Sequence, residues 1–254
     1  MQRIACLIEY IGTNFAGYQV QPNGRTVQQE IETSLMKLHK GQDIKVSASG
    51  RTDAGVHAKG QVIHFDSPLS IPADRWAKAL NTLLPRDIRI IASQYVDTDF
   101  HARYTTTGKQ YRYKVIRRDD IFMRNRAYYV PHSLDIEAMR EACGYMLGTH
   151  DFSSFCAANT SVEDKVRTIT QCEIAEHDDE LNFILAGNGF LYNMVRIAVG
   201  TLLEVGSGKR SPSEVAQIIS SENRKAAGKT APAHGLYLWS VTYAKPLFIR
   251  ENER

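Results

Sequence analysis

The order of predicted strands and helices is the strongest constraint on the fold of this 254-residue chain, because the same order occurs twice. Short or alternating apolar runs predict strands, and apolar residues at helical spacing predict helices. The first half is predicted to contain, in order, a strand Arg3–Tyr10, a helix opening at Thr26, strands Ile44–Ser49 and Gln61–Phe65, a helix with Pro72 in its first turn, and a strand Ile88–Tyr95. The second half is predicted to contain a strand Gln110–Val115, a helix Asp135–Leu147, strands Val166–Ala175 and Leu181–Ala186, a helix Leu191–Glu204 followed by a short one capped by Ser211, and a strand Leu236–Tyr243.

Each half therefore has the order β-α-β-β-α-β, which is that of the ferredoxin-like split unit. We predict an α+β fold of two ferredoxin-like halves with antiparallel sheets, helices on one face of each sheet, and a basic cleft between the halves. The polar stretch 104–108 predicts the boundary, with one half at 1–104 and the other at 105–254. No repeat of individual residues accompanies this order, so the duplication is one of architecture.

Composition and local patterns indicate a soluble protein of a reducing compartment. Hydrophobic residues make up 43% and charged residues 23% of the chain. The longest apolar candidate, Phe190–Val205, is interrupted by Asn193, Arg196 and Glu204, and the amino terminus becomes polar too early for a signal peptide. Four cysteines lie far apart without a C-x-x-C pair. We therefore expect a cytoplasmic protein with no membrane partner, no zinc site and no disulfides.

One short stretch, residues 49–58, concentrates reactive side chains between two predicted strands. It reads SGRTDAGVHA and brings Arg51, Asp53 and His57 together, with a glycine on each side of the carboxylate. Tight loops anchored by strands are common places for working residues. Taken alone, the stretch also fits an aspartate that only hydrogen-bonds its own turn.

A second stretch, from His101 to Arg126, has a larger positive net charge than the chain as a whole. It contains eight Lys or Arg against two Asp, a net charge of +6, whereas the whole chain has +3. Tyrosines and a phenylalanine are interleaved with these cations. Cations for phosphates beside rings for unstacked bases are typical of RNA recognition, although a solvated basic strand and loop would look the same.

Motifs for other chemistries fail on their spacing. Gly228-Lys229-Thr230 ends like a phosphate-binding loop, but Asn223 occupies the place of its first glycine, and Gly187-Asn188-Gly189 lacks the third glycine of a dinucleotide fingerprint. A metal cluster of Asp53, His57, His64 and Asp66 is conceivable, but a glycine interrupts any ligand-bearing helix there. We therefore expect no nucleotide cofactor and no metal.

Arg196 is unusual because it lies on an otherwise apolar predicted helix. Arginine is almost never buried without a partner. It either reaches the rim and water or forms an ion pair that keeps a carboxylate charged and oriented.

Motifs along nearly the whole chain resemble those of the tRNA pseudouridine synthase A family. In chain order, the matching segments are Gly17–Gln21, Thr26–Gln28, Gly50–Ala58, Gln61–Val62, His64–Phe65, Asn81, Leu84–Pro85, Phe100–Arg103, Tyr111–Tyr113, His150–Phe155, Asn193–Arg196, Val199–Gly200, Ala231–Ala233 and Gly235–Leu238. Two positions depart from the pattern: Ile11 stands where the family usually has aspartate, and Tyr18 where it usually has tryptophan.

The resemblance implies an isomerase that converts uridine to pseudouridine at positions 38, 39 and 40 in the anticodon arm of tRNA. Asp53 matches the essential aspartate, which attacks C1′, attacks the ring or removes the 2′ proton. Arg196 matches the arginine that pairs with this aspartate, and Tyr111 matches the tyrosine that stacks on the uracil and whose hydroxyl could move a proton. These three are the expected catalytic residues, in the basic catalytic cleft.

The resemblance also implies the partners of the enzyme. Its substrate is tRNA, it works as a homodimer, and the isomerisation requires no cofactor. We expect tRNA contacts from Tyr111, Arg51, His57, Arg103, Arg124 and Arg126, with Arg51 filling the gap left by a flipped base or holding its phosphate.

Two functions of other classes remain as alternatives. A non-catalytic RNA-binding module could use the same sheets, and a metal-dependent hydrolase could use Asp53, His57 and His64. Release of tritium from tRNA labelled at uridine C5 separates an isomerase from a binder, and a chelator would silence a metal enzyme.

Overall fold

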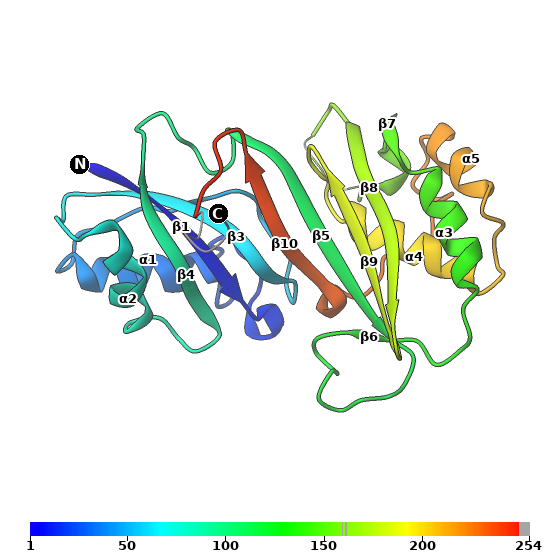
Figure 1. Ribbon diagram of the computed structural model, residues 1–254, viewed down its shortest axis with the longest axis horizontal. Helices are drawn as coiled ribbons and strands as arrows, with labels where there is room; N and C mark the ends of the chain where they lie inside the picture. Colours follow the sequence, from blue (N-terminus) through cyan, green and yellow to red (C-terminus); the bar gives the residue numbers. More distant parts are fainter. Residues whose placement is uncertain (159, 161, 249–254) are drawn as a thin grey trace, which may run out of the picture. The chain divides into compact units, whose positions relative to one another are not determined.

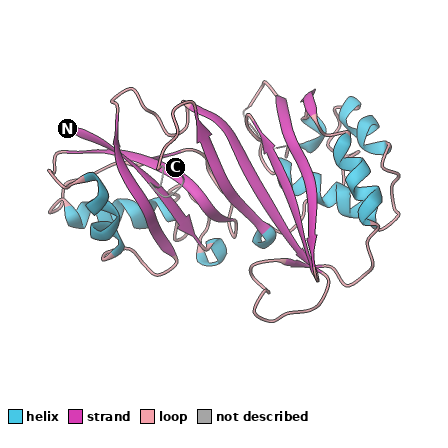
Figure 2. Ribbon diagram, in the orientation of Figure 1, coloured by secondary structure: helices cyan, strands magenta, loops and turns pink. Residues whose placement is uncertain are grey.

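The computed structural model describes residues 1–158, 160 and 162–248 and shows a mixed α+β chain (Figures 1 and 2). The chain divides into two compact units. The first consists of Met1–Thr107 and the segment that starts at Tyr237, and the second is Gly108–Leu236. No helix in the described part of the chain is long and apolar enough to span a membrane.

The first unit is a sheet with the strand order β4-β1-β3-β10, and β2 pairs with β3. Its strands are β1 (Gln2–Tyr10), β2 (Ser47–Ala48), β3 (His57–Ser67), β4 (Ile88–Val96) and β10 (Leu236–Tyr243), and its helices are α1 (Val27–Leu38) and α2 (Trp76–Asn81), the latter preceded by a 3₁₀ turn at Ala73–Arg75. Strand β1 runs antiparallel to both β3 and β4. Figure 2 shows the two helices on one side of these strands.

Apolar spacing in the sequence explains why α1 packs as it does. Thr26 caps the helix, its side chain accepting the N–H of Gln29, and Val27, Ile31 and Leu35 along one face are 0% exposed. Ile4 and Ile8 of β1 are also fully buried. Burial of each such side chain contributes about 1.5–3 kcal/mol. The sheet that positions the 49–58 stretch is thus fixed by a well-formed core.

The second unit is a sheet with the strand order β5-β9-β8-β7, and β6 pairs with β5. Its strands are β5 (Thr106–Ile116), β6 (Tyr128–Tyr129), β7 (Gly148–Asp151), β8 (Val166–His177) and β9 (Glu180–Gly187), and its helices are α3 (Ile136–Gly144), α4 (Met194–Gly206) and α5 (Glu214–Ser220). In Figure 1 these helices lie together beside the sheet. Helix α4 is the most apolar of them and buries ten of its residues.

The last strand was expected in the second half, and the structure places it in the first. Strand β10 pairs with β3, with Tyr237 opposite His57 and Leu238 opposite Ala58. This pairing is parallel, as is that of β6 with β5, so the prediction of antiparallel sheets was wrong at these two pairs. A long crossover connection permits parallel pairing, and the chain between β3 and β10 is long enough to provide one.

Two element boundaries also differ from the prediction for local reasons. The strand predicted at Ile44–Ser49 is reduced to β2 because the N–H of Val46 donates to Glu32 of α1 (3.2 Å) instead of joining a sheet. The helix predicted at Asp135–Leu147 is capped by Asp135, as expected at its start, but ends at Gly144.

Candidate active site

Asp53 lies in the short connection between β2 and β3. We call residues 49–57, which are this connection and the first residue of β3, the Asp53 loop. Asp53 is half-buried, while Arg51 on the same loop is exposed. The backbone N–H of Val56 donates to the carbonyl of Asp53 (3.1 Å) and closes a turn around the carboxylate. The first unit therefore presents Asp53 from a turn rather than from a flexible tether.

Buried hydrogen bonds hold this loop from the sheet side. Gln61 of β3 accepts from the Ser49 hydroxyl (2.5 Å) and donates to the Gly50 carbonyl (2.8 Å). The hydroxyl of Thr52, next to Asp53, bonds that of Tyr10 at the end of β1 (2.8 Å). Burial raises the pKa of Tyr10 to about 12, so its hydroxyl stays protonated and available for this bond. Each such bond contributes about 0.5–1.5 kcal/mol and fixes one side of the loop.

A glycine segment, residues 12–17, holds the opposite side of the Asp53 loop. A Cβ atom on Gly12 would lie 2.0 Å from the carbonyl oxygen of Val56, so only glycine fits there. Gly17 has a positive φ of 104°, and the next residue, Tyr18, donates its N–H to the Thr52 carbonyl (3.0 Å). The loop is packed backbone against backbone.

His57 is one of the residues that pack the Asp53 loop against its neighbours. Its side chain is 1% exposed, and its Nδ1 accepts the N–H of Gly12 (3.0 Å). Its ring stacks on Tyr237 of β10, with 4.6 Å between ring centroids. His57 thus holds the Asp53 loop against Gly12 and β10 with its ring almost fully buried, and the tRNA contact expected of it stays a prediction.

Tyr111 belongs to the second unit, at the middle of β5 opposite Leu185 of β9. Its side chain is 9% exposed, and its ring meets that of Phe190 edge to face, with 5.1 Å between centroids. Edge-to-face packing fixes the plane of the ring. Its neighbour two residues on, Tyr113, is fully buried and donates to the Pro232 carbonyl (2.8 Å).

Arg196 lies in the first turn of α4 in the same unit and is half-buried. Its Nε donates to the Ala231 carbonyl (2.7 Å), and its Nη1 donates to Oδ1 of Asn193 (2.8 Å). Asn193 adopts the left-handed conformation at the helix start, which directs its side chain to the guanidinium. Two fixed acceptors orient the guanidinium plane, as a residue that pairs with a carboxylate requires.

Arg51 and Arg103 line one pocket of the first unit, with a volume of about 220 Å³. Its other lining residues come from the chain just after the glycine segment, from α1, from β2 and the residues beside it, and from the turn before β5, namely Tyr18, Gln19, Gln28, Val46, Ser47, Ala48, Gly50, His101 and Tyr104. The lining is mostly polar. Tyr18, the position where the sequence departs from the family's tryptophan, is therefore part of a wall of this pocket.

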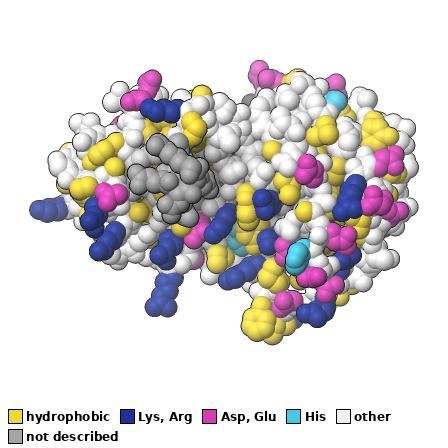
Figure 3. Space-filling view, viewed as in Figure 1, with side chains coloured by type: hydrophobic (Ala, Val, Ile, Leu, Met, Phe, Trp, Pro, Cys, Tyr) yellow, Lys and Arg dark blue, Asp and Glu magenta, His cyan; other side chains and the backbone are white. Residues whose placement is uncertain are grey.

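Arg124 and Arg126 lie on the connection from β5 to β6, residues 117–127, which we call the β5–β6 loop. Both are exposed, and Ile121 and Phe122 beside them are 66% and 82% exposed. Figure 3 shows hydrophobic and basic side chains side by side at this edge of the second unit. Three other cations of the basic stretch form ion pairs within the unit: Lys114 with Glu180, Arg117 with Glu176, and Arg118 with Asp179.

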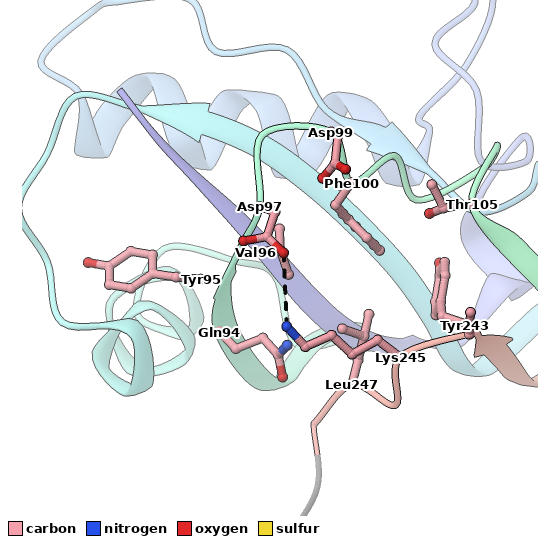
Figure 4. A pocket seen from close by; sticks show the side chains of 11 residues that line it. Gln94, Tyr95, Val96, Asp97, Asp99, Phe100, Thr105, Tyr243, Lys245 and Leu247 are labelled. Carbon is pink, nitrogen blue, oxygen red and sulfur yellow. Dashed lines mark ion pairs between the residues drawn. The ribbon is translucent and has the colours of Figure 1, made fainter.

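A larger pocket of about 440 Å³ lies elsewhere in the first unit, between the end of β4 and the segment after β10 (Figure 4). Asp97 and Lys245 form an ion pair across it (3.9 Å), and Phe100 and Tyr243 supply aromatic walls. None of the predicted site residues lines it. Volume alone does not identify it as the place of the chemistry.

The residues considered as metal ligands have other contacts. Asp66 accepts two hydrogen bonds from Arg3 (2.8 and 2.7 Å), and His64 accepts the N–H of Ala102 (3.2 Å). Within residues 1–158, 160 and 162–248, no three His, Cys, Asp or Glu side chains are grouped so that they could hold a metal ion.

The structure thus brings Asp53, Arg51 and His57 together on one loop, and places Tyr111 and Arg196 in the other unit. Sequence reasoning missed the residues that hold the Asp53 loop: Gly12, Tyr10 and Thr52. Their contacts join positions about 40 residues apart, which no local pattern displays. In the sequence, the glycines of the matching motifs and the Gln61-Val62 pair were the signals that could have indicated this packing.

Known proteins resemble this chain along nearly its whole length. A sequence model of a family described as tRNA pseudouridine synthase matches residues 6–105 and 142–244. The tRNA pseudouridine synthase A of Bacillus pumilus is 58% identical over 244 residues, covering 95% of this chain and 99% of that protein. The protein of the same name from Anoxybacillus flavithermus is 57% identical over 244 residues, covering 96% and 99% of the two chains.

Among solved structures, the archaeal box H/ACA sRNP Nop10–Cbf5 complex is similar at a TM-score of 0.36 and 12% identity, over 87% of this chain and 59% of that chain. This likeness is too weak to bear on fold or function. The sequence relatives, in contrast, are more than half identical along almost the whole chain. The chain therefore belongs to the tRNA pseudouridine synthase family, whose enzymes are isomerases that act on uridine in tRNA.

Proposed function

We propose that this protein converts uridine to pseudouridine at positions 38, 39 and 40 in the anticodon arm of tRNA, in the cytoplasm. The observation that carries the proposal is the Asp53 loop, in which a half-buried carboxylate is held from two sides by buried contacts. The reaction breaks the bond from N1 of the uracil to C1′ and forms one from C5 to C1′. The proton leaves C5 and N1 gains one, so atoms and electrons balance without a cofactor.

Asp53 is the proposed catalytic carboxylate, and it must be ionised to act. Attack at C1′, attack on the ring and removal of the 2′ proton all use the same charged oxygen. We assign Arg196 the task of keeping that charge, because a neighbouring guanidinium lowers a carboxylate pKa against desolvation. Its two fixed acceptors, Ala231 and Asn193, support this role since they leave the guanidinium little freedom to turn.

Tyr111 is the proposed base-stacking residue, and its hydroxyl is the proposed proton carrier in the last step. Tyr111→Phe keeps the ring and its contact with Phe190 and deletes only the hydroxyl. We expect normal tRNA binding and a loss of rate of about 10²- to 10⁴-fold, the usual value of positioned proton transfer. Single-turnover rates beside binding curves measure this. A Phe variant as fast as the parent would limit Tyr111 to stacking.

The exposed arginines Arg51, Arg103, Arg124 and Arg126 are the proposed contacts to tRNA. Phosphate contacts would supply most of the affinity. Arg51, next to the catalytic loop, would fill the gap left by the flipped uridine or hold its phosphate. We further propose that the enzyme is a homodimer that binds one tRNA across both subunits.

We also propose that the fold of each unit is ferredoxin-like. The first unit has the order β1, α1, β2, β3, α2, β4, and its strands β4-β1-β3-β2 are paired in that sequence. This arrangement supports a ferredoxin-like unit with β10 as an additional strand. We propose the same kind of fold for the second unit, with its additional short strands.

Tritium release tests the function directly. tRNA transcripts labelled with tritium at C5 of uridine are incubated with the purified protein, and the released label is counted. A synthase releases label from transcripts with uridine at 38, 39 or 40 and not from those with cytidine there, and a chelator has no effect. No release would show a non-catalytic RNA binder, and loss of activity with chelator would show a metal enzyme.

A further inference from the structure

The turn that precedes β5, residues 100–104, presents an aromatic side chain to the outside. Tyr104 is 78% exposed, and its ring stacks on that of His101, with 4.3 Å between centroids and 28° between planes. The guanidinium of Arg103 lies 6.0 Å from the centroid of the same ring. Exposed tyrosines usually have mobile rings, but this one rests on a second ring.

The turn beneath Tyr104 is firmly built. Nδ1 of His101 accepts the backbone N–H groups of Arg103 (3.1 Å) and Tyr104 (3.3 Å). The N–H of Ala102 donates to His64, and the Ala102 carbonyl accepts the hydroxyl of Tyr243 (2.7 Å). A turn with this many fixed contacts can hold an exposed ring in place without help from a ligand.

The surroundings of the ring are those of a nucleotide site. Tyr104 and His101 line the 220 Å³ pocket together with Arg51 and Arg103. That volume is smaller than the roughly 300–1,000 Å³ of pockets that enclose drug-sized ligands, and it fits part of one nucleotide. The two guanidiniums suit a phosphate, and the amides of Gln19 and Gln28 suit the edge of a base or a sugar. Asp53 is not among the lining residues, so the pocket is separate from the reacting carboxylate.

We propose that the ring of Tyr104, supported by His101, stacks on an unpaired base of the bound tRNA other than the reacting uridine, with the phosphate of that nucleotide at Arg103. The inference rests on the proposed function in that the ligand is tRNA. It adds a second nucleotide site, which holds the strand beside the flipped uridine. Base stacking accepts any base, so the site fixes the position of the strand and not its sequence.

The test compares three variants. Tyr104→Leu removes the ring and keeps apolar bulk, and Tyr104→Phe keeps the ring. Tyr145→Leu is the control, because Tyr145 is an exposed tyrosine at the end of α3 in the other unit. We expect Tyr104→Leu to raise KM for tRNA about 5- to 150-fold with kcat within about twofold of the parent, the range of one lost base stack. Tyr104→Phe and Tyr145→Leu should match the parent.

A second readout locates the base. 2-Aminopurine, whose emission changes on stacking, is placed at each unpaired position of the anticodon loop in turn. One position should respond to binding by the parent and by Tyr104→Phe, and lose its response with Tyr104→Leu.

The outcomes are distinct. A KM for Tyr104→Leu within twofold of the parent, or no position that distinguishes Leu from Phe, overturns the proposal. A Leu variant with lower Tm and lower kcat overturns it too, because Tyr104 would then only stabilise the turn. If the parent released no tritium, the proposed function would fail, while the 2-aminopurine response would still report the site.

Discussion

The Asp53 loop and the β5–β6 loop carry the two kinds of residue that an RNA-modifying enzyme needs, and they are built in opposite ways. The first is anchored by Gln61, Thr52 and His57 and packed against the backbone of Gly12. The second exposes Arg124, Arg126 and two large apolar side chains on turns of its own backbone. Asp53, the proposed catalytic residue, thus lies on a support fixed by buried contacts, and Arg124 and Arg126 lie on an exposed loop.

Physical chemistry accounts for the difference. A reacting group must be held within about 0.5 Å of its productive position. Attraction between a guanidinium and a phosphate falls off slowly with distance and tolerates an adaptable side chain. Small steric changes in the Asp53 loop should therefore lower activity, whereas in the β5–β6 loop only changes of charge should weaken tRNA binding.

The largest effect is expected from Asp53→Asn. The amide keeps the size of the side chain but cannot act as base or nucleophile, so tritium release should fall to background. Affinity for tRNA should stay within a few-fold, since phosphate contacts elsewhere supply it. Asp119→Asn, on the β5–β6 side, is the control and should be fully active. Activity above a trace in the Asp53 variant would assign the chemistry to another residue.

Gly12→Ala should have the next largest effect, although Gly12 touches no substrate in the proposal. The added methyl would lie 2.0 Å from the Val56 carbonyl oxygen, so the Asp53 loop must shift. Overpacking of this kind costs about 1–3 kcal/mol, and a displacement of about 1 Å can cost 10²-fold in rate. Thermal melts and single-turnover rates would measure both.

Gly144→Ala is the matched control for that experiment. Gly144 lies in α3 with nothing within 4 Å of an added methyl, so the variant should be as active as the parent and slightly more stable. Equal rates for the two alanine variants would show that the Asp53 loop is less rigid than its contacts imply.

Replacing Arg124 and Arg126 by alanine should have a moderate effect of a different kind. We expect weaker tRNA binding, a maximal rate within about twofold, and a salt slope of log K shallower by up to about 2. The double variant of Arg86 and Arg89, exposed arginines of the first unit, changes the charge equally and serves as the control. An unchanged slope in the Arg124/Arg126 variant would mean that the β5–β6 loop faces away from the RNA.

The smallest expected effect is that of acid on the stability of the sheet that carries the Asp53 loop. Burial lowers the pKa of His64 to about 4, with smaller contributions from His101 and Arg3, which Asp66 opposes. Between pH 6.5 and 4 the unfolded chain binds a proton at this histidine and the folded chain does not. The resulting stability is complete above pH 6.5 and is lost as the pH falls through 4, by at most about 1.4 kcal/mol per pH unit.

Arg124 and Arg126 contribute no such dependence, because arginine stays charged throughout this range. We therefore expect Tm to fall more steeply below pH 6.5 in the parent than in His64→Asn, whose side-chain oxygen can still accept the N–H of Ala102. Parallel Tm curves for the two proteins would remove His64 as the source.

Local signals predicted local structure well. The Thr26 cap and the apolar face after it predicted α1, and the alternation in residues 236–243 predicted β10 to the residue. The strand with which β10 pairs was not predictable. An alternating pattern indicates that a segment forms a strand, but it does not identify the neighbouring strand. Nor could the ion pairs of Lys114 and Arg117 be predicted, since they depend on the register of β5 against β8 and β9.

The candidate site likewise has features that the sequence predicted and features that it could not. The chemistry of Asp53, Tyr111 and Arg196 was suggested by residue type and by motifs. The anchoring role of His57 was not, because burial against Gly12 and Tyr237 is a property of the assembled sheet. A histidine in a reactive-looking stretch resembles a ligand-binding residue until its neighbours are known.

Because β10 is made late in synthesis, the contact that it gives to the Asp53 loop can form only late as well. A ribosome releases the chain from the amino terminus, and N-terminal regions generally fold first. Here the Asp53 loop is complete in sequence by residue 57, yet the aromatic support of His57 is Tyr237, made 180 residues later. A nascent or prematurely terminated chain can form most of the first sheet and still lack this support. Full anchoring of the Asp53 loop is thus completed only after β10 has been made and has paired with β3.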